Sequence, residues 1–126
     1  MDNYKIKILL VEDDPMIVEM YKNRLEEEGF EVLTTDKGSE VLEIAIKEKP
    51  NIVLLDVILP EIDGFSILEM LKNDNHTKNI PVMMLTNLGQ EGDQNKGMNL
   101  GAVQYFIKSK HTPSDVLVEI RKILFK

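Results

Sequence analysis

The sequence contains no cysteine, which excludes disulfides, thiolate metal sites and cysteine nucleophiles. This absence fits a reducing compartment, so we expect a cytoplasmic protein. Long apolar runs are also missing, because no stretch reaches the roughly 18 apolar residues of a membrane-spanning helix. Residues 1–5 lack the basic-then-apolar pattern of a secretory signal. We therefore expect no association with a membrane.

Basic residues are in the minority, since 15 Lys and Arg stand against 22 Asp and Glu and give a net charge of -7. A surface this acidic repels a phosphate backbone, so direct nucleic-acid binding by this domain is not expected. No repeat, low-complexity tract or linker divides the chain. The 126 residues therefore predict one domain, residues 1–126, which is large enough to bury a core.

The most informative stretch is a continuous apolar run, residues 52–55, that leads directly into Asp56. A short apolar run that follows a proline is typical of a strand buried on both faces, as in the middle of a parallel sheet. A charge is costly inside such a strand, so Asp56 is expected at its carboxyl end. Ligands bind at that edge in open parallel sheets.

Apolar runs alternate with amphipathic segments along the whole chain. We predict strands at residues 6–11, 30–35, 52–55, 81–85 and 103–107. We predict helices at residues 15–28, 39–48, 65–73 and 113–124, and a weak helix at 89–101. The alternation predicts an α/β fold: a doubly wound, five-stranded parallel sheet, (βα)5, with flavodoxin-like strand order 2-1-3-4-5 and helices on both faces.

The segment 89–101 is the weakest of the predicted helices. Its apolar face is thin, and Gly92 and Gly97 each cost a helix about 1 kcal/mol relative to alanine. Low local stability is what a moving element requires, so this segment is either a conformational switch or merely a frayed surface loop.

Four predicted strands end in functional groups, and parallel strands bring such ends to one edge of the sheet. These groups are Glu12 with Asp13, Asp56, Thr86 and Lys108. Two carboxylates 4 Å apart repel by about 4 kcal/mol at an effective dielectric of about 20, so cations must offset them. Lys108 offsets one charge. Oxygen ligands with room for water suit Mg²⁺, and Mn²⁺ could substitute.

These groups together suit phosphoryl transfer to a carboxylate. Aspartate can act as a nucleophile that forms an acyl phosphate, and Asp56 would be that nucleophile. The three phosphoryl oxygens then need partners. The metal, the Lys108 ammonium and the Thr86 hydroxyl would each hold one of them.

In this order and spacing the chain resembles the receiver domain of two-component response regulators, the chemotaxis-type or CheY-like fold. The resemblance extends over essentially all 126 residues. It rests on residues 8–14, on Asp56 followed by Pro60 and Asp63-Gly64, on residues 81–86, and on Gly101-Ala102 leading to Tyr105 and Lys108.

The resemblance implies that Asp56 accepts a phosphoryl group from the phosphohistidine of a sensor histidine kinase or a phosphotransfer protein. It implies Mg²⁺ bound by Glu12, Asp13, Asp56 and the backbone carbonyl of Ile58. Thr86 and Tyr105 match the family's switch pair, which alters a downstream protein partner or a fused output domain. Such a domain catalyses only its own phosphorylation and dephosphorylation, so we do not expect an enzyme.

Three departures from the family pattern are visible. Lys108 is followed by Ser109 instead of proline, so we expect a trans peptide there, because cis would cost about 2.5–4 kcal/mol. Val103-Gln104 replaces an acidic pair that some members use to dimerise, which leaves the oligomeric state open. Asn87 stands where the family usually has a small residue and is expected to crowd the entry to the site.

Three rival functions fit the sequence less well. A flavodoxin-like nucleotide-binding protein needs a phosphate cradle after the first strand, where this chain has Glu12-Asp13-Asp14. An aspartyl-nucleophile phosphatase often carries a second aspartate two residues after the first, where this chain has Ile58. A receiver that has lost phosphorylation would serve only in protein interaction, and the complete set of groups at the sheet edge argues against it.

Overall fold

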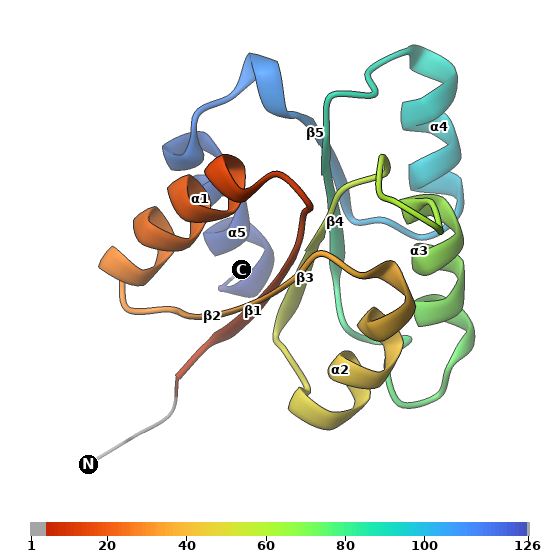
Figure 1. Ribbon diagram of the computed structural model, residues 1–126, viewed down its shortest axis with the longest axis horizontal. Helices are drawn as coiled ribbons and strands as arrows, with labels where there is room; N and C mark the ends of the chain where they lie inside the picture. Colours follow the sequence, from red (N-terminus) through yellow and green to blue (C-terminus); the bar gives the residue numbers. More distant parts are fainter. Residues whose placement is uncertain (1–4, 126) are drawn as a thin grey trace.

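The computed structural model describes residues 5–125. Residues 1–4, most of the segment assessed for a secretory signal, and residue 126 lie outside that range. The strands are β1 (Lys7–Val11), β2 (Glu31–Thr35), β3 (Ile52–Leu55), β4 (Val82–Thr86) and β5 (Gln104–Ile107). They form one parallel sheet in the order β2-β1-β3-β4-β5 (Figure 1). The predicted fold class and strand order are confirmed.

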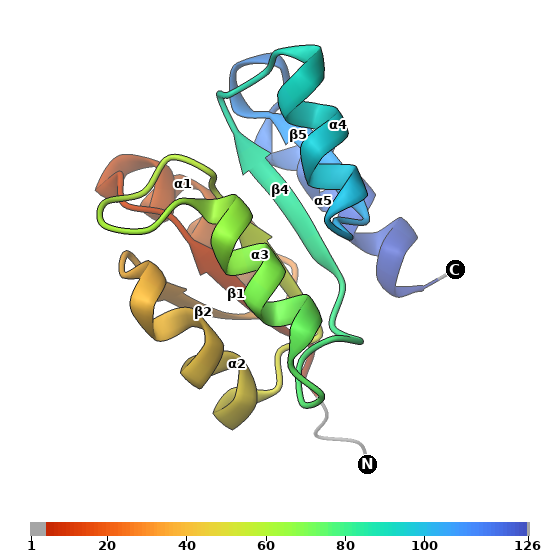
Figure 2. The same ribbon diagram turned by 90° about the vertical axis from the view of Figure 1, so that its right-hand side faces the viewer.

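Helices cover both faces of this sheet. One layer contains α1 (Pro15–Glu27) and α5 (Pro113–Leu124), and the other contains α2 (Val41–Glu48), α3 (Gly64–Asn73) and α4 (Glu91–Asn99). Figures 1 and 2 show the two layers on opposite sides of the strands. Short 3₁₀ turns occupy Gly38–Glu40 and Lys108–Lys110. In the described part of the chain, no helix combines the length and the apolar character that crossing a bilayer requires.

Side chains that alternate along each strand divide the core into two clusters. In β1, Leu9 and Val11 pack with α2 and α3, whereas Ile8 and Leu10 pack with α1 and α5. All of β3 is buried because it lies in the centre of the sheet with a helical layer on each face. Its continuous apolar sequence follows from that position.

The ends of the helices follow local sequence signals. Asp14 caps α1 by accepting a hydrogen bond from the Met16 amide at 2.9 Å. Thr112 and Asp115 form the predicted capping box at the start of α5. The weak helix is real but shorter than predicted, since α4 spans Glu91–Asn99 and its only buried residue is Gly97. Few of its side chains therefore anchor it to the sheet.

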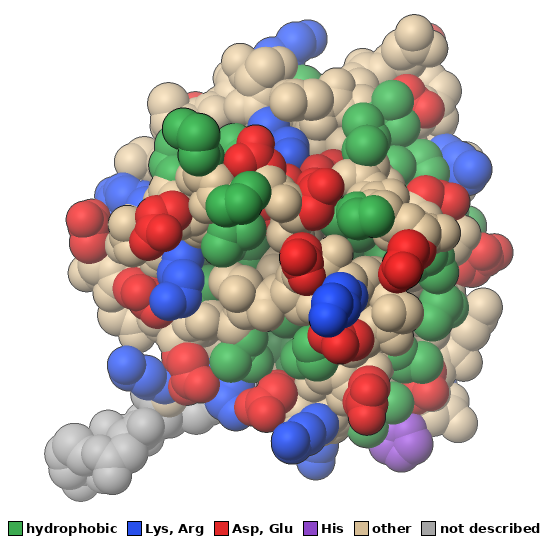
Figure 3. Space-filling view, viewed as in Figure 1, with side chains coloured by type: hydrophobic (Ala, Val, Ile, Leu, Met, Phe, Trp, Pro, Cys, Tyr) green, Lys and Arg blue, Asp and Glu red, His purple; other side chains and the backbone are tan. Residues whose placement is uncertain are grey.

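The surface carries the acidic character of the sequence. Figure 3 shows acidic side chains scattered over the face seen in Figure 1, with basic ones between them. This distribution agrees with the net charge of -7.

Candidate functional site

The candidate site lies at the carboxyl edge of the sheet, the upper edge in Figure 1. Glu12 and Asp13 follow β1, Asp56 follows β3, Thr86 ends β4 and Lys108 follows β5. The backbone holds two of these positions by extending the strand pairing. The Glu12 amide donates to the Thr35 carbonyl and the Asp56 amide donates to the Val11 carbonyl, both at 3.1 Å. The predicted convergence of these residues at one edge is therefore observed.

The Lys108 ammonium is the central contact of the site. Its Nζ donates to Glu12 Oε1 at 2.7 Å and to Asp56 Oδ2 at 2.9 Å. The side chains of Lys108, Glu12 and Asp56 are only 11%, 2% and 6% exposed. Ion pairs this shielded from water are screened little by salt. Lys108 therefore joins two carboxylates that lie 44 residues apart in sequence (56 − 12).

Burial and the cluster's own charges shift two pKa values at the site. Burial raises the pKa of Glu12 and the charge of Asp56 raises it further, although the hydrogen bond from Lys108 lowers it. Burial lowers the pKa of the Lys108 ammonium, but the hydrogen bonds to Glu12 and Asp56 outweigh burial and leave its pKa above the usual value. Lys108 is thus cationic at neutral pH.

Three carboxylates are arranged so that one cation could reach all of them. Glu12, Asp13 and Asp56 each offer an oxygen, and these oxygens lie within 4.8 Å of one another. Glu12 and Asp56 are buried, whereas Asp13 is exposed and keeps the cluster open to water. An all-oxygen set with one open side fits Mg²⁺, which retains several waters when bound. The residues present therefore fit the predicted metal.

Ile58 lies beside the same carboxylate. Its amide donates to Asp56 Oδ1 at 3.1 Å, and its side chain is 57% exposed. Both Asp56 oxygens consequently have a donor, Ile58 on one and Lys108 on the other. The role of the Ile58 carbonyl as a metal ligand stays a prediction.

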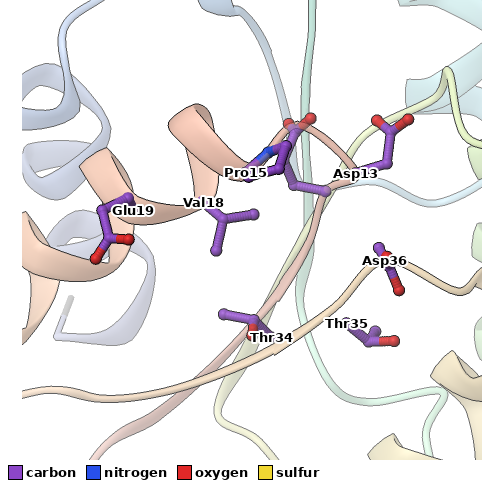
Figure 4. Close-up of a pocket in the computed structure, with 8 residues that line it drawn as sticks. Asp13, Pro15, Val18, Glu19, Thr34, Thr35 and Asp36 are labelled. Carbon is purple, nitrogen blue, oxygen red and sulfur yellow. The ribbon is translucent and has the colours of Figure 1, made fainter.

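A hollow of about 360 Å³ opens beside the carboxylate cluster (Figure 4). It lies between the start of α1 and the end of β2. Its lining residues are Glu12, Asp13, Pro15, Val18, Glu19, Thr34, Thr35 and Asp36. Solvent can therefore approach the Glu12 and Asp13 side of the cluster.

Thr86 and Tyr105 are joined through the main chain of Leu88. Thr86 is fully buried, and its Oγ1 accepts a hydrogen bond from the Leu88 amide at 3.3 Å. The Tyr105 hydroxyl donates to the Leu88 carbonyl. Among the described residues, Thr86 is thus hydrogen-bonded to Leu88 and not to Asp56. Sequence reasoning missed this link because it uses a backbone amide and carbonyl, which every residue type except proline supplies.

Two of the departures noted in the sequence meet in the structure. The Lys108–Ser109 peptide is trans, as predicted. The Asn87 side chain, which was expected to crowd the entry, reaches toward that peptide, and its Oδ1 accepts a hydrogen bond from the Ser109 amide at 2.9 Å. The segments that carry Thr86 and Lys108 are therefore joined beyond the end of the sheet.

The burial of Tyr105 predicts a loss of stability at high pH. Burial, with smaller contributions from the charges of Asp93 and Asp56, raises the pKa of Tyr105 to about 12. Between pH 10.0, the ordinary pKa of a tyrosine, and about 12, the unfolded chain loses this proton while the folded chain keeps it. The free energy of unfolding should therefore fall as pH rises through that interval, and less steeply in Tyr105→Phe. Denaturant titrations across the interval measure both slopes, and identical slopes would contradict the assignment.

Comparisons with known proteins agree with this geometry. A family model described as "Response regulator receiver domain" matches residues 8–121. The probable transcriptional regulator ycf27 of Porphyra purpurea is 37% identical over 124 residues, which cover 98% of this chain and 49% of that protein. The DNA-binding dual master transcriptional regulator RpaA of Synechocystis is 36% identical over 121 residues, or 94% of this chain and 48% of that protein. The chain thus spans about half the length of these relatives.

A solved structure shows the same architecture. The crystal structure of a putative response regulator from Chloroflexus aurantiacus superposes with a TM-score of 0.90 at 30% sequence identity. The match covers 98% of this chain and 100% of that one. The likeness therefore extends over the whole sheet and both helical layers.

Proposed function

Because the chain belongs to the response regulator receiver domain family, we propose that it is a phosphoacceptor signalling domain in which Asp56 is phosphorylated. The donor would be the phosphohistidine of a sensor histidine kinase or a phosphotransfer protein. One observation carries the proposal: Lys108 Nζ contacts both Asp56 and Glu12 at the edge where three carboxylates gather. A domain of this kind turns over only its own phosphoryl group and is not an enzyme acting on a separate substrate.

The chemistry assigns a role to each residue of the cluster. A carboxylate oxygen of Asp56 forms the new P–O bond as the P–N bond of the phosphohistidine breaks, and the bonding electron pair leaves with the imidazole nitrogen. Mg²⁺ held by Glu12, Asp13, Asp56 and the Ile58 carbonyl would supply positive charge for the phosphoryl oxygens. Lys108 supplies further positive charge from the other side. The Ile58 amide fixes the orientation of the Asp56 carboxylate.

The proposal predicts uptake of a single phosphoryl group. Incubation with acetyl phosphate and Mg²⁺ should add the mass of one phosphoryl group to the intact protein, and fragmentation should place it on Asp56. A chelator or the Asp56→Ala substitution should abolish the gain. A gain that persists in Asp56→Ala would refute Asp56 as the acceptor, and no gain in wild type would favour a domain that serves only in protein interaction.

The conformational output would pass through Thr86 and Tyr105. A phosphoryl group adds nearly two negative charges, which would draw the Thr86 hydroxyl away from the Leu88 amide. Because Tyr105 donates to the carbonyl of the same Leu88, movement of this segment would disturb Tyr105 and α4 as well. Two alternative arrangements of one segment are a common basis of such switches.

Hydrogen exchange tests this switch. Beryllofluoride with Mg²⁺, which mimics a phosphoryl group, should change amide protection between residues 88 and 105. The amides of β1 and β3 serve as an internal control and should keep their protection, because they lie in the buried centre of the sheet. Unchanged protection from 88 to 105 would defeat the switch.

The relatives support a proposal for the output and the partners. Those relatives are named as transcriptional regulators and are about twice as long as this chain, so we propose that the domain controls a fused output domain or a separate protein partner. The names of these relatives favour such a regulator over a chemotaxis-type protein. The acidic surface argues against nucleic-acid contact by this domain itself. We propose that the protein acts in the cytoplasm.

A further inference from the structure

We propose that Asn87 is a positioning residue for Lys108, acting through its hydrogen bond to the Ser109 amide. This inference rests on the proposed function, because it concerns how the Lys108 ammonium is held against Asp56. Asn87 and Ser109 each depart from the family pattern, and the structure brings these two residues into direct contact.

The contact lies where the sheet stops. The last paired residues of β4 and β5 are Thr86 and Ile107, and beyond them the two strands continue into different segments. Asn87 follows Thr86 immediately, and the 3₁₀ turn Lys108–Lys110 follows Ile107. The Asn87 Oδ1 bond to the Ser109 amide at 2.9 Å therefore adds a side-chain link one step past the strand pairing.

This link fixes the backbone from which Lys108 projects. The Lys108 side chain must extend from the turn to reach Glu12 and Asp56, and both contacts fall below 3 Å. Ser109 is the next residue, so a restraint on its amide restrains the Lys108 main chain. A proline at position 109 would have no amide hydrogen to donate, and Asn87 would then have no partner there.

The same link joins Lys108 to the segment of the proposed switch. The main-chain groups of Leu88 form hydrogen bonds with Thr86 and Tyr105. The side chain of Asn87, the residue before Leu88, accepts a hydrogen bond from Ser109. Three consecutive residues are thus attached to β5 or to the turn that follows it. The alternative is an exposed hydrogen bond with no consequence for the site, since both residues are exposed.

A double-mutant cycle separates these alternatives. The rate of Asp56 phosphorylation at saturating acetyl phosphate and Mg²⁺ is measured for wild type, Asn87→Ala, Ser109→Pro and the double variant. Asn87→Ala should slow the reaction about threefold to tenfold in the wild-type background, which corresponds to the loss of one hydrogen bond. It should have no further effect beside Ser109→Pro, because the donor is already gone. Equal effects in both backgrounds would overturn the proposal.

Two controls complete the experiment. Asn79→Ala changes an exposed asparagine just before β4, at the opposite edge of the sheet, and should react at the wild-type rate. Asn87→Asp keeps an oxygen that can accept from Ser109 and should retain more of the rate than Asn87→Ala does. An Asn87→Asp rate equal to that of Asn87→Ala would count against the hydrogen bond.

A measurement that needs no phosphodonor tests independently whether Asn87 positions Lys108. The ¹⁵N resonance of the Lys108 ammonium reports its contacts with Glu12 and Asp56, and it should shift in Asn87→Ala and stay in place in Asn79→Ala. An unmoved resonance in Asn87→Ala would overturn the positioning role even if Ser109→Pro failed to fold. If wild type took up no phosphoryl group, the proposed function would fail while this resonance still tested the link.

Discussion

Lys108→Ala should slow phosphorylation of Asp56 by about 100-fold or more, the scale of losing one charge-stabilising donor in a shielded site. The ammonium lies 2.9 Å from Asp56 Oδ2 before any phosphoryl group arrives. It is therefore already in position to neutralise charge that develops during transfer, without reorganisation. Alanine leaves the carboxylates with only the metal as a counter-charge.

The same substitution should weaken the fold. Lys108 pairs with Glu12 and Asp56, whose side chains are almost entirely shielded from water. Removing one partner from a buried ion pair costs about 3 kcal/mol or more, because the remaining charge is left unpaired. The pKa of Glu12 should rise further, since the Lys108 hydrogen bond is the largest of the interactions that lower it. Mg²⁺ should restore part of the stability by supplying a replacement cation.

A matched control lies in the same turn. Lys110 is exposed, so Lys110→Ala removes an equal charge without touching the cluster and should leave both rate and stability near wild type. Rates come from intact mass spectra over time, and stabilities from denaturant titrations with and without Mg²⁺. If Lys108→Ala and Lys110→Ala reacted equally fast, Lys108 would have no role beyond net charge.

The fold was predictable because local sequence and buried position agree. The continuous apolar runs of β1 and β3 predict strands that are buried on both faces, and the structure places side chains of β1 in both core clusters and buries all of β3. Carboxyl ends of parallel strands share an edge whatever the loops do, so Glu12, Asp56 and Lys108 could be placed together from topology alone. The structure adds that Lys108 bonds to both acids.

The parts that escaped prediction are contacts with no residue-type signature. The link between Thr86 and Tyr105 runs through the amide and carbonyl of Leu88, and any residue except proline would supply the same groups at that position. The bond from Ser109 to Asn87 depends on where two loops lie after their strands end, which periodicity does not specify. A bulky residue at position 87 was therefore interpreted as an obstruction, although its carboxamide has a partner.

Gly64 shows a further limit of sequence reasoning. It forms part of the Asp63-Gly64 pair, and the sequence alone does not show why glycine stands there. Its φ angle is not among the positive ones, which among the described glycines occur at Gly29 and Gly101. The requirement is steric instead. A Cβ at this position would overlap the carbonyl oxygen of Asp56 and approach Val57 Cα to 2.7 Å.

Gly64→Ala should therefore damage both the fold and the site. The Gly64 amide donates to the Val57 carbonyl at 2.8 Å, so α3 begins directly against the backbone that carries Asp56. Backbone atoms cannot rotate away as a side-chain end can, and we expect a loss of about 3 kcal/mol in the free energy of unfolding.

The displacement of Asp56 relative to Lys108 should also slow phosphorylation in the Gly64→Ala molecules that remain folded. Gly92→Ala is the matched control, because no atom lies within 4 Å of a Cβ there and alanine favours α4. It should raise stability by about 0.5–1 kcal/mol. Denaturant titrations give both stabilities and intact mass spectra give the rates. Equal stabilities for the two variants would show that α3 can retreat from Asp56 at little cost.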